Sequence, residues 1–101
     1  MEDNNNKIQQ FLKVYNVMNA FWQSRSDESP DAMEVRFTRS SLCAMFDIHF
    51  KMHRRILEAE LDWQLEEWKK LDSSSRSEFR VVKYQYISKE DRYVFSLQKI
   101  N

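Results

Sequence analysis

Glycine is absent from the chain, and this absence constrains the fold more than any other feature of the sequence. Glycine is the residue that most readily adopts positive φ angles and lets a backbone approach a ligand closely. Phosphate-cradling loops, dinucleotide-binding fingerprints and the nucleophile elbow of hydrolases all need glycine at set positions. The sequence therefore argues against most familiar small-molecule enzymes.

The chain of 101 residues has the length of one domain, for which a radius of gyration of about 13 Å is expected. Hydrophobic residues make up 42% of it, which is enough apolar area for a core without disulfides or a metal. The single cysteine, Cys43, lies in a Leu-Cys-Ala-Met setting and is expected to be a small buried hydrophobe. We expect residues 1–6 to be disordered and 7–101 to form the domain.

The first residues lack the positive charge and apolar run of a signal peptide, and no apolar stretch is long enough to cross a bilayer. A soluble cytoplasmic protein with no membrane partner is expected.

The spacing of apolar residues predicts the elements at both ends of the chain. Steps of three and four predict an amphipathic helix over about 6–24, and alternation predicts a short strand over 33–37. Two further runs, 78–87 and 92–100, predict a hairpin whose loop is 88–91. Polar loops are expected at 24–31, which holds the only proline, and at 72–75.

Residues 39–71 have a helical pattern throughout, with Thr38 or Ser40 as the expected N-cap. One apolar stripe contains Leu42, Phe46, Phe50, Leu57, Leu61 and Trp68, and another contains Ile48, Met52, Ile56, Ala59 and Trp63. An unbroken helix of this length would measure about 50 Å, longer than such a domain is wide. Either the helix protrudes to meet a partner, or it breaks near Asp47, which could cap a helix starting at about Phe50.

Charge is balanced overall, with 16 basic and 16 acidic residues, but it is unevenly distributed along the chain. Residues 38–57 and 73–101 each carry an excess of positive charge, whereas 1–37 and 58–72 are acidic. This pattern is typical of a protein that presents one face to a polyanion, although a solvated helix face also explains it.

The order helix, strand, helix, helix, hairpin resembles that of winged helix-turn-helix domains. Within 39–57, Leu42 and Phe46 match inward positions of the first motif helix, Cys43 its small residue, Ile48 the apolar residue after the turn and Leu57 a late apolar position. Asp47 stands where the turn usually has glycine, and His53 where an apolar residue is usual. The resemblance implies an α+β fold with a small three-stranded antiparallel sheet, in which the strand between the first two helices pairs with the C-terminal hairpin.

The same resemblance implies duplex DNA binding with a regulatory or replication-associated role, no cofactor, and a homodimer. The third helix, at 50–57, would enter the major groove, and residues 88–92 would form the wing. The implied DNA-binding residues are Arg39, Lys51, Arg54, Arg55, Lys89 and Arg92.

The alternative is a non-enzymatic interaction or inhibitor module that dimerises or docks through one long helix at 39–71. Leu61, Trp63 and Trp68 are its candidate partner-interface residues, although packing against the first helix explains at least one tryptophan equally well. The aromatic residues of the hairpin are interpreted as cross-strand pairs, with a stacking surface for single-stranded nucleic acid as the other possibility.

Catalytic and metal chemistry find little support in the sequence. His49 and His53 are four residues apart, but no third ligand stands at a convincing spacing. No nucleophile and base pair can be proposed, so we expect neither an enzyme nor a metal protein.

Overall fold

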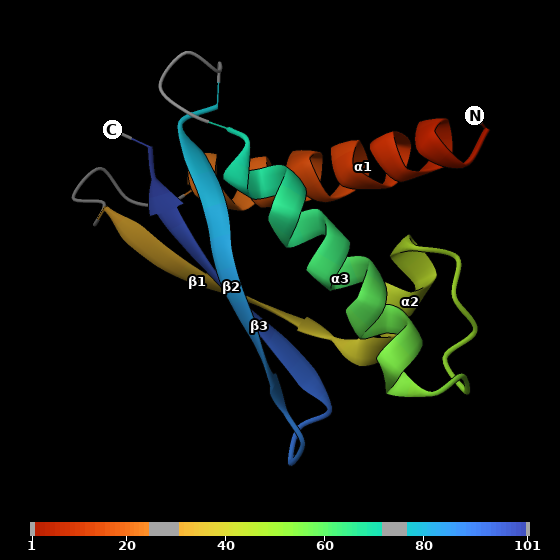
Figure 1. The fold of residues 1–101 in the computed structure, drawn as a ribbon. Coiled ribbons are helices and arrows are strands. Elements are labelled where there is room, and N and C mark those ends of the chain that lie inside the picture. Colours follow the sequence, from red (N-terminus) through yellow and green to blue (C-terminus); the bar gives the residue numbers. More distant parts are fainter. Residues whose placement is uncertain (1, 25–30, 72–76, 101) are drawn as a thin grey trace.

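The computed structural model describes residues 2–24, 31–71 and 77–100, with side chains from residue 7 onward. The elements are α1 (Glu2–Ser24), β1 (Ala32–Thr38), α2 (Arg39–Met45), α3 (Arg54–Lys69), β2 (Phe79–Ile87) and β3 (Arg92–Lys99) (Figure 1). The fold is α+β with an open, three-stranded antiparallel sheet of order β1-β3-β2. The loops expected at 24–31 and 72–75 fall almost entirely outside the described residues.

The elements at both ends agree with the sequence analysis. The strand at 33–37, the hairpin and its loop at 88–91 are confirmed, and the first helix ends at Ser24 as expected. The helix starts earlier than expected, because α1 begins at Glu2 and not near residue 6.

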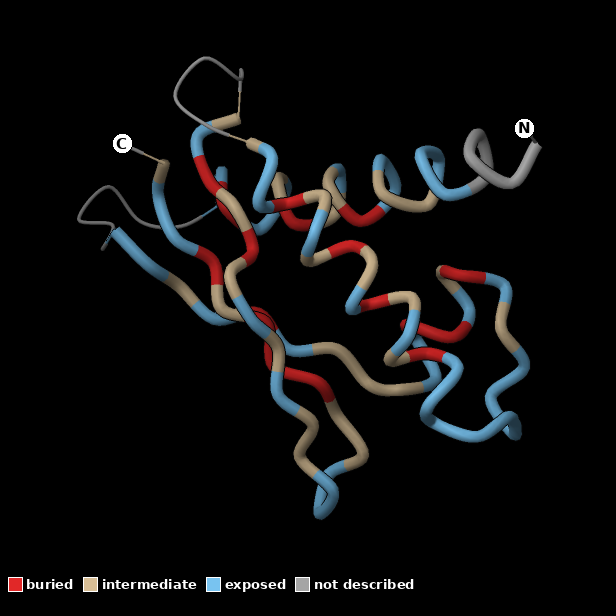
Figure 2. Tube along the Cα trace, in the orientation of Figure 1, coloured by how far each residue is buried: buried red, intermediate tan, exposed pale blue. Residues whose placement is uncertain are grey.

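The sheet has one apolar and one polar face, as the alternation along β1 requires. Met33, Val35 and Phe37 pair with Leu97, Phe95 and Tyr93 of β3, whereas the intervening Glu34 and Arg36 are exposed. The helices lie on one side of the sheet, and buried residues line the space between them and the strands (Figures 1 and 2).

The centre of the core is a group of aromatic rings from α1, α3 and β2. Phe79 stacks with Trp22 at 5.2 Å and Tyr15 at 5.6 Å between ring centroids. Trp68 of α3 lies 5.0 Å from Phe11 and 5.7 Å from Tyr15, which confirms that one tryptophan of the 58–71 region packs against the first helix. The contacts of Phe79 and Trp68 with the rings of α1 join segments that are distant in sequence, so they fix how α1 and α3 sit on the sheet.

Two predicted interface residues belong to this core. Trp68 is 1% exposed and Leu61 is 3% exposed, so neither can contact a partner unless the domain opens. This corrects their assignment as surface anchors, because an apolar side chain so fully enclosed contributes to folding instead. Trp63 is half-buried, with the Lys7 ammonium 5.3 Å from its ring centroid. Cys43 is buried, as expected.

The region 39–71 is divided into two helices, α2 and α3, joined by residues 46–53, which we call the connecting loop. The longest dimension of the molecule is 39 Å, too short for an unbroken helix over these residues. Thr38 is the N-cap of α2, where its hydroxyl accepts a hydrogen bond from the Ser41 amide at 3.1 Å. Of the two predicted caps, Thr38 is therefore the correct one.

Asp47 ends α2 rather than capping the next helix, which corrects the expectation for this residue. Its φ of 58° lies in the left-handed region, where aspartate is one of the few residues besides glycine that are tolerated. Ile48 N–H donates to Cys43 O at 2.8 Å and Asp47 N–H to Ala44 O at 3.3 Å, the pairing of a Schellman helix end. Aspartate thus adopts here the left-handed backbone conformation that glycine usually adopts at a helix end.

The third helix starts at Arg54 and not near Phe50, so Phe50 and Lys51 lie in the connecting loop. His53 is its N-cap, and the imidazole Nδ1 accepts a hydrogen bond from Arg55 N–H at 3.0 Å. The break also decides which apolar stripe faces the core. Leu57, Leu61 and Trp68 are buried, whereas Met52 and Ile56 of the other stripe are exposed.

Candidate nucleic-acid interface

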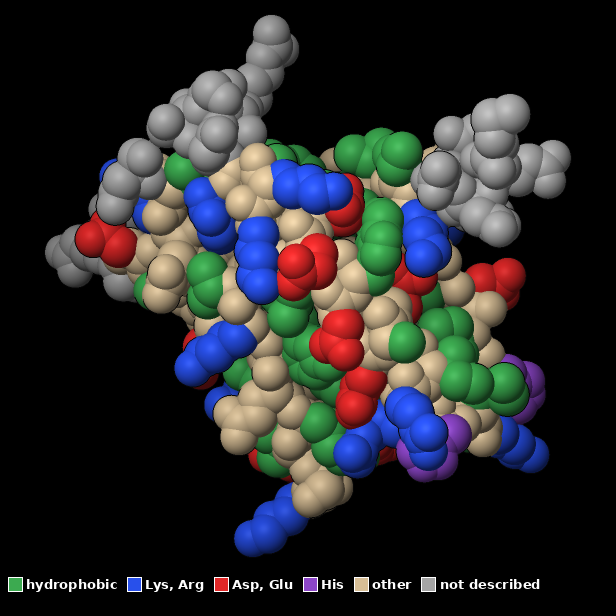
Figure 3. Space-filling model, viewed as in Figure 1, with side chains coloured by type: hydrophobic (Ala, Val, Ile, Leu, Met, Phe, Trp, Pro, Cys, Tyr) green, Lys and Arg blue, Asp and Glu red, His purple; other side chains and the backbone are tan. Residues whose placement is uncertain are grey.

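A groove of about 610 Å³ lies where the connecting loop, the first turn of α3 and the hairpin meet. We call it the hairpin groove; Arg39, Lys51, Arg54, Tyr86 and Asp91 are among its lining residues. In Figure 3, Lys, Arg and His side chains gather at the lower edge of the molecule, where α3 begins and the hairpin ends. Acidic side chains occupy the middle of the same view, along α3.

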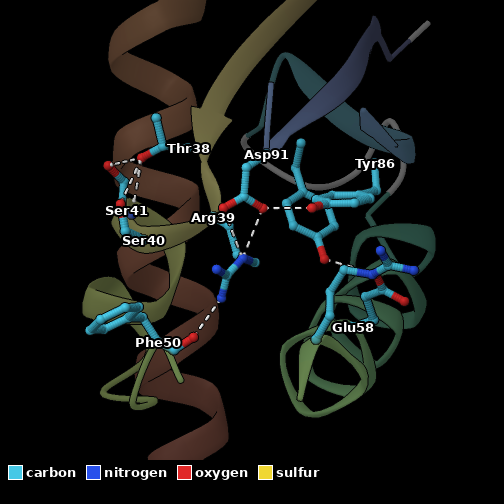
Figure 4. A network of polar contacts seen from close by, with 10 residues as sticks. Thr38, Arg39, Ser40, Ser41, Phe50, Glu58, Tyr86 and Asp91 are labelled. Carbon is cyan, nitrogen blue, oxygen red and sulfur yellow. Dashed lines mark hydrogen bonds and ion pairs between the residues drawn. The ribbon is translucent and has the colours of Figure 1, made fainter. Parts of the chain in front are cut away.

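Arg39 holds the three segments of the groove together. Its Nε donates to both Asp91 carboxylate oxygens, at 2.8 and 3.1 Å, and another guanidinium nitrogen donates to the Phe50 carbonyl (Figure 4). Its backbone N–H donates to Asp91 O at 3.0 Å, and the Tyr86 hydroxyl donates to Asp91 Oδ1 at 2.6 Å. Arg39, predicted as a DNA contact, thus links the start of α2, the hairpin loop and the connecting loop.

The pKa of Asp91 lies below its ordinary value, chiefly because of its hydrogen bonds from Arg39 and Tyr86. A carboxyl whose pKa is lower in the folded state stabilises the fold above its unfolded pKa of about 4, and this contribution is lost as the pH falls through the folded pKa. The network is therefore fully formed near neutral pH.

Asp91→Asn tests this network. Asparagine tolerates the positive φ of 52° at this position, so the turn is retained while the charge is removed. We expect the free energy of unfolding at pH 7 to fall by about 1 kcal/mol, a modest loss because the Asp91 side chain is half exposed and solvent screens the ion pair. In urea unfolding followed from pH 7 to pH 2, the difference from the natural protein should shrink below about pH 4; a difference that stays constant would contradict the role of the charge.

Arg54, another predicted DNA contact, is also bound to side chains of the protein itself. Its side chain forms an ion pair with Glu58 one turn later, and its guanidinium carbon lies 4.2 Å from the centroid of the Tyr86 ring. The Arg54 side chain remains 45% exposed, and Arg54 is one of the residues that line the groove.

Carboxylates of α3 hold the helix against the hairpin. The Tyr93 hydroxyl donates to Glu58 at 2.7 Å, and the Tyr84 hydroxyl donates to Asp62 at 2.6 Å. Burial, together with these hydrogen bonds, raises the pKa of both tyrosines, so both stay protonated as donors. The sequence analysis missed these pairings, because the partners are 22 and 35 residues apart and no local pattern reports them.

The hairpin aromatics are cross-strand pairs. Tyr86 and Tyr93 are register partners with ring centroids 4.9 Å apart, and Tyr84 and Phe95 are register partners at 6.2 Å. Tyr93 and Phe95 are buried, so they offer no stacking surface to a ligand.

Three of the six predicted cations are exposed and have no ion pair or side-chain hydrogen bond among the described residues: Lys51, Arg55 and Lys89. Lys51 lies in the connecting loop, Arg55 in the first turn of α3 and Lys89 in the hairpin loop. Arg92, at the start of β3, lies 3.6 Å from a Glu90 carboxylate oxygen. The structure therefore brings Arg39, Lys51 and Arg54 into the groove, with Arg55 next to it in sequence and Lys89 and Arg92 on the hairpin.

The beginning of α3 has an excess of positive charge. Its first turn contains no acidic residue and carries Arg54 and Arg55, although the N-terminus of a helix is the positive end of its dipole and favours anions. The imidazole Nδ1 of each histidine accepts a hydrogen bond from the backbone N–H two residues on. No group of three potential metal ligands occurs in residues 7–24, 31–71 and 77–100.

Comparison with known proteins gives no relative: no protein-family model, no curated protein and no solved structure matches this chain. None of the helices in the described part of the chain combines the length and the apolar character that spanning a bilayer requires.

Proposed function

We propose that this protein binds duplex DNA with the hairpin groove and its rim. The observation that carries the proposal is the convergence of the two positively charged segments of the sequence. Lys51 and Arg54 come from 38–57, Lys89 and Arg92 come from 73–101, and the break between α2 and α3 brings these segments to one edge of the molecule. A cationic edge of this kind is what a phosphate backbone requires.

The arrangement of elements supports the same proposal. The chain follows the order helix, strand, helix, helix, hairpin, and β1 pairs with β3 of the hairpin, as the winged helix-turn-helix resemblance implies. In our proposal, the start of α3 approaches the major groove, and the loop 88–91 approaches the neighbouring backbone as a wing. Lys51, Arg55 and Lys89 contact phosphates, whereas Arg39 and Arg54 position the segments that carry them.

The acidic part of α3 determines how the helix would approach DNA. Asp62 and Glu66 are exposed along the helix beyond its second turn, and they would be repelled by phosphates running parallel to it. The first turn carries Arg54 and Arg55 instead. We therefore propose that α3 meets DNA with its N-terminal end and leaves its acidic length outside the contact.

The interaction-module alternative loses its main support. It depended on a continuous helix at 39–71 and on Leu61, Trp63 and Trp68 as surface anchors. The helix is broken, and Leu61 and Trp68 are buried, which leaves Trp63 as the one anchor at the edge of the core.

A charge-neutralising variant tests DNA binding. Lys51→Gln, Arg55→Gln and Lys89→Gln together should weaken binding to a labelled mixed-sequence duplex by roughly tenfold to 100-fold near 0.1 M salt. The slope of log affinity against log salt should fall by about 2.7, since each lost phosphate contact removes about 0.9. Fluorescence anisotropy over a salt series measures both quantities.

The matched control removes the same charge elsewhere. Lys13, Lys83 and Lys99 are exposed and lie outside the hairpin groove, and their combined change to glutamine alters net charge equally. This control should lose far less affinity. Equal losses of affinity in the two triple variants would mean that net charge alone, and not the hairpin groove, determines binding. If the folded natural protein does not bind DNA at low salt, the proposed function is overturned.

A further inference from the structure

The connecting loop presents an aromatic pair at the molecular surface. The rings of His49 and Phe50 are stacked, with centroids 5.4 Å apart and planes 11° from parallel. Phe50 is 50% exposed, whereas most of the other phenylalanines pack in or against the core. An aromatic ring in such a position loses apolar burial unless something else covers it.

Hydrogen bonds fix both members of the pair. Arg39 donates to the Phe50 carbonyl, which points toward the polar network while the Phe50 ring points away from it (Figure 4). The Lys51 N–H donates to His49 Nδ1 at 3.1 Å and orients the imidazole. These hydrogen bonds fix the Phe50 peptide, from which the ring extends away from the polar network.

The chain segment that contains and follows the pair is cationic. Residues 48–57 include Lys51, Arg54 and Arg55 and contain no acidic residue. Met52 and Ile56 add exposed apolar surface next to these charges, at 50% and 43% exposure. Flat aromatic surface bordered by cations is complementary to a nucleotide, whose base stacks and whose phosphate is anionic.

We propose that Phe50, backed by His49, stacks on an unpaired nucleobase, so that the preferred ligand is a duplex with an adjoining single strand. This inference rests on the proposed function and names the form of DNA that the site takes. Inside a duplex both faces of each base are covered by neighbouring bases, so a surface ring can stack only on a terminal or unpaired base. Lys51 and Arg55 beside it then hold the duplex and single-strand phosphates at the junction.

Binding to three ligands tests the inference: a blunt duplex, the same duplex with a short unpaired tail, and the tail strand alone. The natural protein should bind the tailed duplex at least about fivefold more tightly than the blunt one, the scale of one base stacked on an aromatic residue. A fluorescent base analogue at the first unpaired position should be quenched on binding. Equal affinity for tailed and blunt duplexes would overturn this inference and leave duplex binding intact, whereas binding to neither would overturn both.

Variants separate stacking from simple apolar contact. Phe50→Ala and Phe50→Leu should each abolish the preference for the tailed duplex and the quenching, because leucine keeps apolar volume without a flat ring. Phe50→Trp should retain both. Leu12→Ala on α1, which removes an equally exposed apolar side chain, is the control and should change neither. If Phe50→Leu keeps the preference for the tailed duplex, stacking is contradicted. If the natural protein binds anionic lipid vesicles and not DNA, and Phe50→Ala loses that vesicle binding, the patch contacts a membrane surface and the inference is overturned.

Discussion

Trp68→Ala should lower the free energy of unfolding by about 3–5 kcal/mol, the range found when a large aromatic side chain is removed from a core. Trp68 is 1% exposed and contacts the rings of Phe11, Tyr15 and Phe79, so its removal leaves a cavity between α1, α3 and β2. The small size of the domain limits how much stability remains to absorb such a loss.

Trp63→Ala is the matched comparison, because it removes the same side chain five residues earlier on the same helix. Trp63 is half-buried and contacts Lys7, so the expected loss is smaller, about 1–2 kcal/mol. Urea unfolding followed by circular dichroism at 222 nm measures both variants without relying on tryptophan fluorescence. Similar losses in the two variants would contradict the placement of Trp68 in the core and Trp63 at its edge.

The second large effect is expected from Leu57→Ala, which should cost about 2–5 kcal/mol. Leu57 is 1% exposed and anchors the start of α3, the part of the helix that carries Arg54 and Arg55. Its loss should therefore loosen the hairpin groove and weaken DNA binding as well as lower stability.

Ile56→Ala, one residue away, should change stability by less than about 0.5 kcal/mol, because Ile56 is 43% exposed. The neighbouring pair tests the orientation of α3 directly, since rotating the helix by one residue would exchange the two results. Comparable unfolding midpoints for the two variants would contradict the observed orientation. Measuring both at pH 7 keeps the Asp91 network intact in each case.

The ends of the chain could be predicted from sequence because their signals are local. Alternation of apolar and polar residues marks β1, β2 and β3, and polar residues mark the turn at 88–91. Asp47 in the sequence also indicates where the helix in 39–71 breaks, but it does not indicate how the break is formed. The sequence favours aspartate as a cap for the next helix, whereas the chain uses the tolerance of aspartate for positive φ to end α2.

The orientation of α3 could not be predicted from periodicity alone. Two apolar stripes fit 39–71 equally well, and only the geometry of the break and the ring cluster on α1 and β2 select the stripe containing Leu57 and Trp68. For the same reason, Leu61 and Trp68 looked like surface anchors in the sequence. An apolar residue on a helix indicates burial, but the pattern does not tell whether the core or a partner buries it.

The sequence indicates which cations belong to the candidate site, but it does not indicate the contacts between the site residues. The clustering of positive charge at 38–57 and 73–101 identified the cations by local counting. The pairing of Arg39 with Asp91, 52 residues away, depends on the tertiary fold. Through this contact Arg39 positions the loops, whereas Lys51 and Lys89 remain exposed.

The central claim is that the hairpin groove and its rim are the DNA-binding surface, and a titration of isotopically labelled protein with a short duplex, followed by two-dimensional NMR, tests it most directly. The account predicts that backbone amide signals shift at residues 46–56 and 88–92, and that signals of the outward face of α1 around Ile8 and Leu12 stay in place. Shifts confined to α1 or to the polar face of the sheet, or no shifts at low salt, would contradict it.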